Sequence, residues 1–173
     1  LLANPEAREM VVEVEVVAAD GGVRGPIGVT IAPFSSRLLQ DVVALATGGG
    51  DLPDPVLRVL TSAGPAAPVA MVSLLDRSSG DPETVLPAAV TDEALVVPAV
   101  AHARGRDGAE WRSDLLLHNP GPGEARFRLE LRPEGRSSTV LRTPELRLGA
   151  GRSAAYRDLV GTVFGRAGAG WLR

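Results

Sequence analysis

A short motif that occurs twice constrains this chain more than any other feature. Leu1-Leu2-Ala3-Asn4-Pro5 opens the chain, and Leu115-Leu116-Leu117-His118-Asn119-Pro120 repeats it, with an offset of 115 positions between Asn4 and Asn119. In both places the motif precedes a stretch in which apolar and charged residues alternate. Self-similarity at a fixed offset is typical of repeated structural units. We therefore predict that the chain contains two copies of one module.

The alternating stretches, 10–18 and 124–132, predict strands. Three pairs of apolar residues coincide at the offset of 115: Val12 with Phe127, Val14 with Leu129, and Val16 with Leu131. The alternate positions are Val11, Glu13, Glu15 and Val17 in the first copy and Arg126, Arg128, Glu130 and Arg132 in the second. Apolar residues at every second position are typical of a strand with one buried face. We expect these six side chains to face the core of each copy.

The alignment continues after a gap of two residues. At an offset of 117, Val29 and Ile31 meet Leu146 and Leu148, and Asp41-Val42-Val43 meets Asp158-Leu159-Val160; the offset then returns to 115, where Val56-Leu57-Arg58 meets Trp171-Leu172-Arg173. The gaps fall in Gly-rich and Ser-rich stretches, where loops tolerate insertions. Asp is a favoured residue at helix N-termini. We predict one short helix in each copy, at 41–47 and 158–164.

Short strands, frequent turn signals and the absence of long amphipathic segments predict an all-β fold. We expect two tandem antiparallel β-sandwich modules, residues 1–94 and 95–173, with a closed barrel as the alternative. The first copy is expected to lack the strand that precedes the motif, and the second to lack the strands that follow 173. Either the chain is a fragment of a longer array, or neighbouring chains supply these strands. Residues 68–76, rich in Val, Met and Leu, are expected to form a central strand.

Composition limits the classes of function. The chain contains no Cys, which excludes disulfides and thiolate metal sites, and no apolar run of 18 residues, which excludes a membrane-spanning helix. Charge is distributed unevenly: residues 1–103 carry 5 Arg and 13 Asp or Glu, whereas residues 104–173 carry 13 Arg and 8 Asp or Glu. Such asymmetry indicates either an electrostatic partner or a solvated surface without one.

Few residues offer catalytic chemistry. Ser113, Asp114 and His118 are the components of a nucleophilic triad, but no G-x-S-x-G turn accompanies them. In an extended strand Asp114 and His118 share a face four residues apart, too far for a direct hydrogen bond. We expect His118 to bond a turn, and His102, the second His, shows no catalytic spacing. No catalytic residue is predicted, and the chain is expected not to be an enzyme.

Metal, cofactor and nucleic-acid sites are not expected either. The acidic loops 51–54 and 76–81 lack the spacing of a dedicated calcium loop, so solvated loops are the favoured interpretation and structural calcium the alternative. The Gly-rich stretches lack a G-K-[ST] sequence, so no phosphate cofactor is predicted. Single-strand binding would need aromatic residues among the basic ones, and Phe127 has core parity. The basic residues in question are Arg126, Arg128, Arg132, Arg136 and Arg142.

Several turn and core motifs of the second copy resemble those of tandem Ig-like β-sandwich modules of large bacterial secreted and cell-surface proteins. The matching stretches are Val97-Pro98-Ala99-Val100-Ala101-His102, Trp111-Arg112-Ser113-Asp114-Leu115, Leu117-His118-Asn119-Pro120, Asp158-Leu159-Val160, Phe164-Gly165 and Gly168-Ala169-Gly170. The resemblance covers most of 97–173 and, more loosely, 1–90. It implies an extracellular or cell-surface structural or adhesive role, and it carries over no catalytic residue.

The sequence therefore leads to two functional expectations. The first is a non-enzymatic structural or adhesive repeat that assembles head-to-tail by strand complementation with neighbouring copies of the chain or adjacent modules. The acidic residues Glu13 and Glu15 and the basic residues Arg126 and Arg128 would orient that assembly. The second is a carbohydrate- or protein-binding accessory module of a secreted protein, which needs an exposed aromatic platform. Its candidates are Trp111, Tyr156 and Trp171, the last two expected to be buried because they align with Leu39 and Val56.

Overall fold

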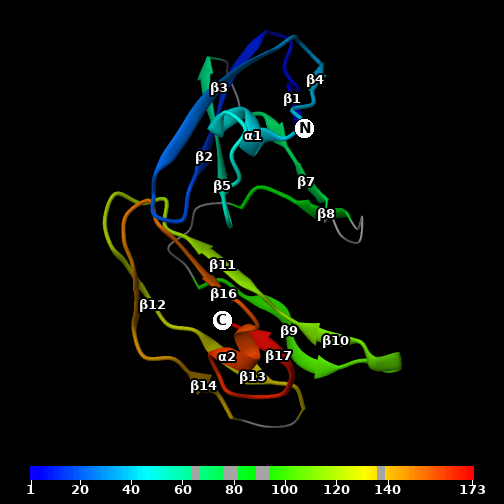
Figure 1. Ribbon diagram of the computed structural model, residues 1–173. Helices are drawn as coiled ribbons and strands as arrows, with labels where there is room; N and C mark the ends of the chain where they lie inside the picture. Colours follow the sequence, from blue (N-terminus) through cyan, green and yellow to red (C-terminus); the bar gives the residue numbers. More distant parts are fainter. Residues whose placement is uncertain (64–66, 76–81, 89–93, 136–138) are drawn as a thin grey trace. The chain divides into compact units, whose positions relative to one another are not determined.

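The computed structural model describes residues 1–63, 67–75, 82–88, 94–135 and 139–173 (Figure 1). In these ranges short antiparallel strands dominate, with two α-helices, α1 (Val42–Thr47) and α2 (Leu159–Thr162), and one 3₁₀ turn at Arg106–Gly108. The predicted all-β class and the two short helices are confirmed. The chain divides into two compact units, Leu1–Ala18 with Gly22–Ala89, and Ala19–Gly21 with Val90–Arg173.

The first unit is built on a three-stranded sheet and two smaller strand groups. In the largest sheet β2 (Met10–Val17) lies between β3 (Val23–Ile31) and β5 (Val56–Ala63). The second group places β1 (Leu2–Ala3) between β4 (Ser36–Arg37) and β6 (Val69–Ala70). The third is the pair of β7 (Val72–Leu75) with β8 (Pro82–Val85).

The core of the first unit forms where the alternation predicts it. Val12, Val14 and Val16 are all buried, and Val12 and Val14 share a cluster with Leu2, Met10, Val29 and Ile31. The expectation of a central strand at 68–76 is wrong. Within the described residues β7 pairs with β8 alone, and Leu74 and Leu75 are 50% and 67% exposed. Apolar content does not reveal whether a strand has neighbours on both sides, which is why the prediction failed.

The second unit contains a five-stranded sheet and two strand pairs. The sheet has the order β10 (Glu110–Arg112), β9 (Val97–Arg104), β17 (Gly168–Leu172), β13 (Glu130–Pro133) and β14 (Leu141–Arg142). One pair is β11 (Leu115–His118) with β16 (Ser153–Tyr156). The other is β12 (Ala125–Phe127) with β15 (Leu146–Leu148).

The predicted strand at 124–132 is interrupted between β12 and β13. Leu129 donates its N–H to Oγ1 of Thr143, at 3.0 Å, and accepts the N–H of Thr143 at its carbonyl. A side-chain oxygen thus replaces one ladder acceptor and divides the strand in two. Side-chain direction is unaffected: Leu129 and Leu131 are buried, and Phe127 packs against the same cluster, as predicted.

Strand pairing in the two units coincides at the offsets found in the sequence. In the first unit Ala3 pairs with Ser36, Met10 with Ile31, Val12 with Val29, and Val16 with Leu57. In the second unit His118 pairs with Ser153, Ala125 with Leu148, Phe127 with Leu146, and Leu131 with Leu172. Each pair maps onto its counterpart when 115 or 117 is added to its residue numbers. The two motif copies therefore open the same antiparallel framework.

Candidate functional site

The repeated Asn residues are the only buried polar or charged residues of the described chain, with Asn4 2% and Asn119 8% exposed. Asn4 Nδ2 donates to the carbonyl oxygens of Arg8, Ile31 and Ala32 at 2.7, 3.1 and 3.2 Å, and Oδ1 accepts the N–H of Glu6 at 2.9 Å. Asn119 Nδ2 donates to the carbonyl oxygens of Gly123, Leu148 and Gly149 at 2.8, 3.0 and 3.0 Å, and Oδ1 accepts the N–H of Gly121 at 3.0 Å.

These two hydrogen-bond sets are equivalent partner by partner. Buried polar groups are normally hydrogen-bonded, and here every polar atom of each side-chain amide has a protein partner. Each Asn closes its own turn and ties it to the end of the strand that follows 27 or 29 residues later. The Asn of each Asn-Pro motif therefore has a structural role, because both polar atoms of its side-chain amide are bonded to the backbone of its own unit.

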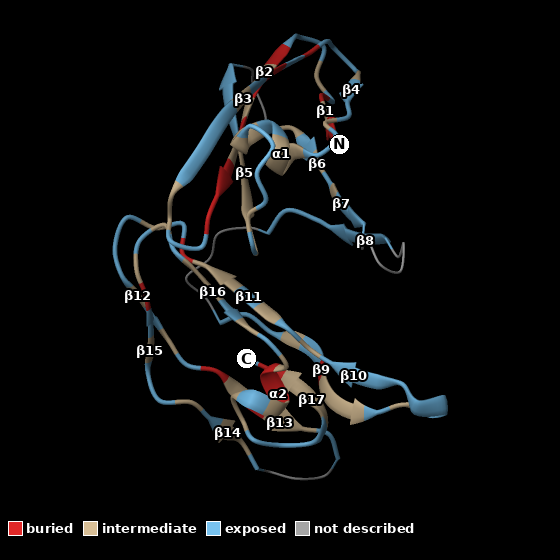
Figure 2. Cartoon of the chain, viewed as in Figure 1, coloured by how far each residue is buried: buried red, intermediate tan, exposed pale blue. Residues whose placement is uncertain are grey.

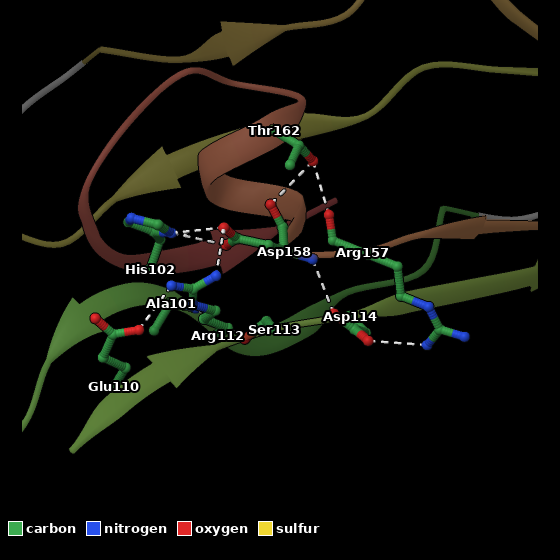
Figure 3. Close-up of polar contacts among 9 residues, drawn as sticks. All are labelled: Ala101, His102, Glu110, Arg112, Ser113, Asp114, Arg157, Asp158 and Thr162. Carbon is green, nitrogen blue, oxygen red and sulfur yellow. Dashed lines mark hydrogen bonds and ion pairs between the residues drawn. The ribbon is translucent and has the colours of Figure 1, made fainter.

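A second polar cluster surrounds the start of α2 (Figure 3). His102, on β9, places Nδ1 2.8 Å from both carboxylate oxygens of Asp158, the residue that precedes α2. Arg112, on β10, lies with Nη1 3.9 Å from Asp158 Oδ2 and donates to Glu110 at 2.6 Å. Asp158 itself has a left-handed backbone, with φ of 46°.

Asp114 is the other carboxylate of this polar cluster. Its Oδ1 accepts the backbone N–H of Asp158 and its Oδ2 accepts Nη1 of Arg157, both at 2.8 Å. The bond from the Asp158 N–H, and after it the bond from Arg157, lowers the pKa of the Asp114 carboxyl below its ordinary 3.8. The hydrogen bond to Glu110, followed by the charges of Glu110 and Asp158, raises the pKa of Arg112.

Backbone contacts hold β9, β10 and α2 together at this point. Ser113 exchanges bonds with Ala101, donating its N–H to the carbonyl and accepting the Ala101 N–H at Oγ, both at 2.9 Å. Its carbonyl accepts the N–H of Leu159 at 2.8 Å. Gly161 leaves room for the His102–Asp158 pair, because a Cβ there would lie 2.6 Å from both His102 Nδ1 and Asp158 Oδ2.

The candidate triad of the sequence is not assembled in the structure. Ser113 Oγ bonds Ala101, Asp114 bonds Asp158 and Arg157, and His118 Nδ1 lies 3.0 Å from Oγ of Ser153, its partner across the β11–β16 ladder. The His102–Asp158 pair was not predicted. Its two residues are 56 positions apart, and the one sequence signal for it is Gly161, which replaces Ala44 of the first copy.

The chemistry available to the His102–Asp158 pair is limited. A carboxylate on one ring nitrogen fixes the tautomer and orientation of an imidazole. Nucleophilic catalysis also needs a hydroxyl or thiol within hydrogen-bond reach of that imidazole. Among the described residues, no hydroxyl group is hydrogen-bonded to His102. We interpret the cluster as a structural one, whose hydrogen bonds hold the β9–β10 hairpin against α2.

Comparison with known proteins identifies one family. The family described as "Family of unknown function (DUF5719)" matches residues 1–169. The chain belongs to the DUF5719 family. No curated protein and no solved structure matches it significantly. The matched residues span both units and so include both copies of the framework.

Other predicted features of this DUF5719 chain also have places in the structure. Within the described ranges no group of three His, Asp or Glu side chains lies close enough to hold a metal ion, and no helix is long and apolar enough to cross a membrane. The acidic loop 76–81 and Arg136 lie outside those ranges. Trp111 is 65% exposed, whereas Tyr156 and Trp171 are partly buried, the latter 5.1 Å from the guanidinium of Arg132.

Several charges on the predicted acidic and basic faces form ion pairs with nearby residues. Glu15 forms an ion pair with Arg58, its partner across the β2–β5 ladder. On the basic face Arg126 lies 3.4 Å from Glu124 and 3.9 Å from Glu145, and Arg142 lies 2.6 Å from Glu130. Much of the local charge is therefore balanced before any partner arrives.

The most prominent difference between the units of the DUF5719 chain is a strand edge. In the second unit β17 pairs with β13 on one side and with β9 on the other. In the first unit Val56 and Leu57, the counterparts of Trp171 and Leu172, begin β5. This strand pairs with β2, and the described residues place no strand on its other side. Within the described parts of the chain, the backbone N–H and C=O groups on the outer edge of β5 therefore have no partner strand.

Proposed function

We propose that this DUF5719 chain is a non-enzymatic structural or adhesive segment, built from tandem Ig-like β-sandwich modules and located outside the cell or on its surface. Adjoining modules or chains cover strand edges that each module leaves open, which produces a head-to-tail array. The observation that carries the proposal is the framework closed twice by Asn4 and Asn119, with one edge of the first copy that no strand of the described residues pairs.

The use of polar groups supports this proposal. The buried amides, the His102–Asp158 pair and the Asp114 carboxylate all bond groups within the fold. By contrast, the β5 edge presents backbone groups to an incoming strand, and an edge of this kind binds extended chains through main-chain hydrogen bonds. The geometry favours association through strands over chemistry at side chains.

Charge has a secondary part in this assembly. The Glu15–Arg58 and Glu130–Arg142 pairs lie within single sheets, and exposed ion pairs of this type are worth at most about 1 kcal/mol. Complementary charge between modules affects orientation and encounter rate more than affinity. We therefore expect association to weaken with salt but not to disappear.

Sedimentation velocity of the full chain over a range of concentrations tests the proposal. The expected result is concentration-dependent association at low salt that persists in reduced form at high salt. Leu60→Lys, which adds a charge on the β5 edge, should reduce association, because lysine on an edge opposes strand addition. Leu38→Lys is the matched control, since Leu38 is also exposed but lies in no strand. A folded chain that stays monomeric under all conditions would contradict head-to-tail assembly.

Exposure of Trp111 favours a second function, a carbohydrate- or protein-binding accessory module. Its indole packs over Gly105, where a Cβ would lie 2.5 Å from Nε1, so the ring is held in place while most of it faces solvent. Aromatic side chains presented in this way are suited to binding. Titration of tryptophan fluorescence with polysaccharides tests it, with Trp111→Ala as the control. Saturable quenching that disappears in the variant would favour this function over the structural one.

A further inference from the structure

The small sheet of the first unit, β4–β1–β6, has two faces of different character. Leu2 and Ala70 pair across β1 and β6 and belong to the core of this unit. Successive side chains of a strand lie on opposite sides of a sheet, so the residues that alternate with Leu2 and Ala70 form the opposite face. We call it the Phe34 face, and its residues are Leu1, Ala3 and Pro5, Phe34, Ser36 and Leu38, and Val69 and Met71.

The Phe34 face is apolar and exposed. Phe34, Leu38 and Val69 are 73%, 66% and 61% exposed, and Leu1 and Met71 are exposed to a lesser degree. Both residues of β4 are exposed (Figure 2). No side chain of the face is charged, although charged residues make up 23% of the chain. Contiguous apolar patches of this kind on a folded protein mark interaction sites.

Phe34 itself is unfavourable for an isolated unit. Its φ is 50°, in the left-handed region that strains a bulky residue, and most of its ring is exposed to solvent. At the offset of 117 the second copy has Gly151, with φ of 66°, and glycine adopts this backbone without strain. A phenylalanine at a strained and exposed position indicates a role in contacts outside the unit.

The corresponding face of the second unit lacks most of this apolar surface. Where both copies have the position, small or polar residues replace three residues of the Phe34 face: Gly151 replaces Phe34, Ala155 replaces Leu38, and His118 replaces Ala3. Leu116, the counterpart of Leu1, remains and is 44% exposed. The apolar face is therefore a property of the first unit and not of the framework that both units share.

We propose that the Phe34 face binds the Phe34 face of a second copy of this chain, forming a two-fold symmetric dimer. This inference goes beyond the proposed function, which concerns strand edges and not the faces of sheets. In a two-fold contact the same patch serves both partners, so like charges within it would oppose one another. The Phe34 face contains no charged side chain and meets itself without that repulsion. The same absence gives a charged partner nothing to pair with.

The size of the Phe34 face also agrees with a dimer. Its five large apolar residues leave on the order of 500 Å² exposed in each copy, at the upper end of the largest patches on ordinary monomers. Contact between two such faces, with Ala3, Pro5 and Ser36 included, would bury roughly 1,200 Å² in total, the lower limit of specific interfaces. A shallow hollow lined in part by Ala3, Pro5 and Ser36 lies beside Phe34 and offers a place for the ring of the second copy. We therefore expect a reversible dimer of modest affinity.

Sedimentation velocity over a range of concentrations tests the dimer. Phe34→Gly removes the ring and the backbone strain together, so we expect a folded chain whose dimer dissociation constant is at least about tenfold higher. Val69→Lys, which places two like charges in the contact, should have an effect of similar size. Leu116→Lys is the matched control, because it adds a charge to the corresponding face of the second unit and should leave the dimer unchanged. Thermal unfolding of each variant shows whether its fold is retained.

Two further variants separate this dimer from head-to-tail assembly. A two-fold contact closes at the dimer, whereas contact through the β5 edge continues to larger species. Leu60→Lys acts on the β5 edge, so it should remove the larger species and leave the dimer. Leu38→Lys leaves that edge unchanged but places a charge on the Phe34 face, so it should weaken the dimer and leave the edge contact intact.

A Leu60→Lys chain that stays monomeric at every concentration would overturn the dimer. An unchanged dissociation constant in Phe34→Gly, or equal weakening by Leu116→Lys, would overturn its assignment to the Phe34 face. Sedimentation with phosphatidylcholine vesicles covers the other apolar partner. Vesicle binding by a chain that forms no dimer, lost in Phe34→Gly, would assign the face to a lipid surface instead. A Phe34-dependent dimer in a chain that forms no larger species would support this inference and contradict head-to-tail assembly.

Discussion

Asp41 and Asp158 occupy equivalent positions before the two helices, and their differences are instructive. Their backbone angles are nearly equal, with φ and ψ of 48° and 56° at Asp41 and of 46° and 54° at Asp158. Asp41 caps its helix through Ala44, whereas Asp158 bonds His102 on a neighbouring strand. The local sequence thus determines the backbone conformation of the turn, whereas the neighbouring strand determines which group the Asp carboxylate bonds. Repetition of a backbone does not imply repetition of a site.

The largest expected effect tests what the units share. Asn4→Ala and Asn119→Ala should each destabilise their own unit by about 3 kcal/mol or more, because several buried carbonyl and amide groups lose their partners. Urea denaturation combined with hydrogen exchange would assign each loss to a unit. Gln40→Ala removes an exposed amide and is the matched control, with an expected change within about 0.5 kcal/mol. A large loss for one Asn and a small one for the other would show that the turns are not equivalent.

The next effect tests how the units differ. Val160→Ala should cost about 2 kcal/mol, because it removes two buried carbon groups and leaves a cavity. Val43→Ala makes the same chemical change at the equivalent position of α1, and we expect less than about 1 kcal/mol because Val43 is only partly buried. Chemical denaturation measures both values. Equal losses would mean that something already covers α1 as fully as β9 covers α2.

A smaller effect exchanges the residues that distinguish the two helices. Gly161→Ala should separate His102 from Asp158 and allow the Asp158 carboxylate to cap α2 as Asp41 caps α1. Alanine favours the helix over glycine by about 1 kcal/mol, which offsets the weak pair, so we expect little net change in stability. Nitrogen-15 NMR of the His102 ring and of the residue 161 amide is the measurement. Spectra with the His102–Asp158 bond intact would contradict the role assigned to Gly161.

The smallest expected effect is a loss of stability of the second unit at acidic pH. Because the pKa of folded Asp114 lies below its ordinary 3.8, its contribution to stability is present above about pH 4 and is lost as the pH falls through the folded value. Asp114→Asn should therefore lower the stability of the second unit at neutral pH and reduce the acid sensitivity of α2. The measurement is the rate of hydrogen exchange of α2 amides between about pH 5 and about pH 3, compared with that of α1 amides over the same range. An unchanged acid profile in the variant would refute this assignment.

Much of the framework could be predicted from sequence because it depends on local patterns. Alternation at Val12, Val14 and Val16 places these side chains in the core, and the offsets of 115 and 117 match the observed pairing. The exposed β7–β8 pair was not predictable, since Leu74 and Leu75 are apolar whether or not a strand covers them.

The polar cluster was less accessible to sequence reasoning. His102 and Asp158 meet through tertiary packing of β9 against α2, and neither residue stands in a motif that specifies the other. Gly161 carried information only by contrast with Ala44. Prediction of such a pair requires knowledge of which strand covers the helix, and the described residues of the first copy include no such strand for comparison.

One hydrogen-bonded framework is formed twice in this chain, and the exchange of its two buried Asn amides tests this most directly. The chain contains two Asn residues, so an amide-selective nitrogen-15 NMR spectrum identifies two Asn side-chain NH₂ groups, those of Asn4 and Asn119. Because each NH₂ group donates to three backbone carbonyls, we expect both groups to exchange with solvent slowly and at similar rates. Rapid exchange of either group in the folded chain would contradict it.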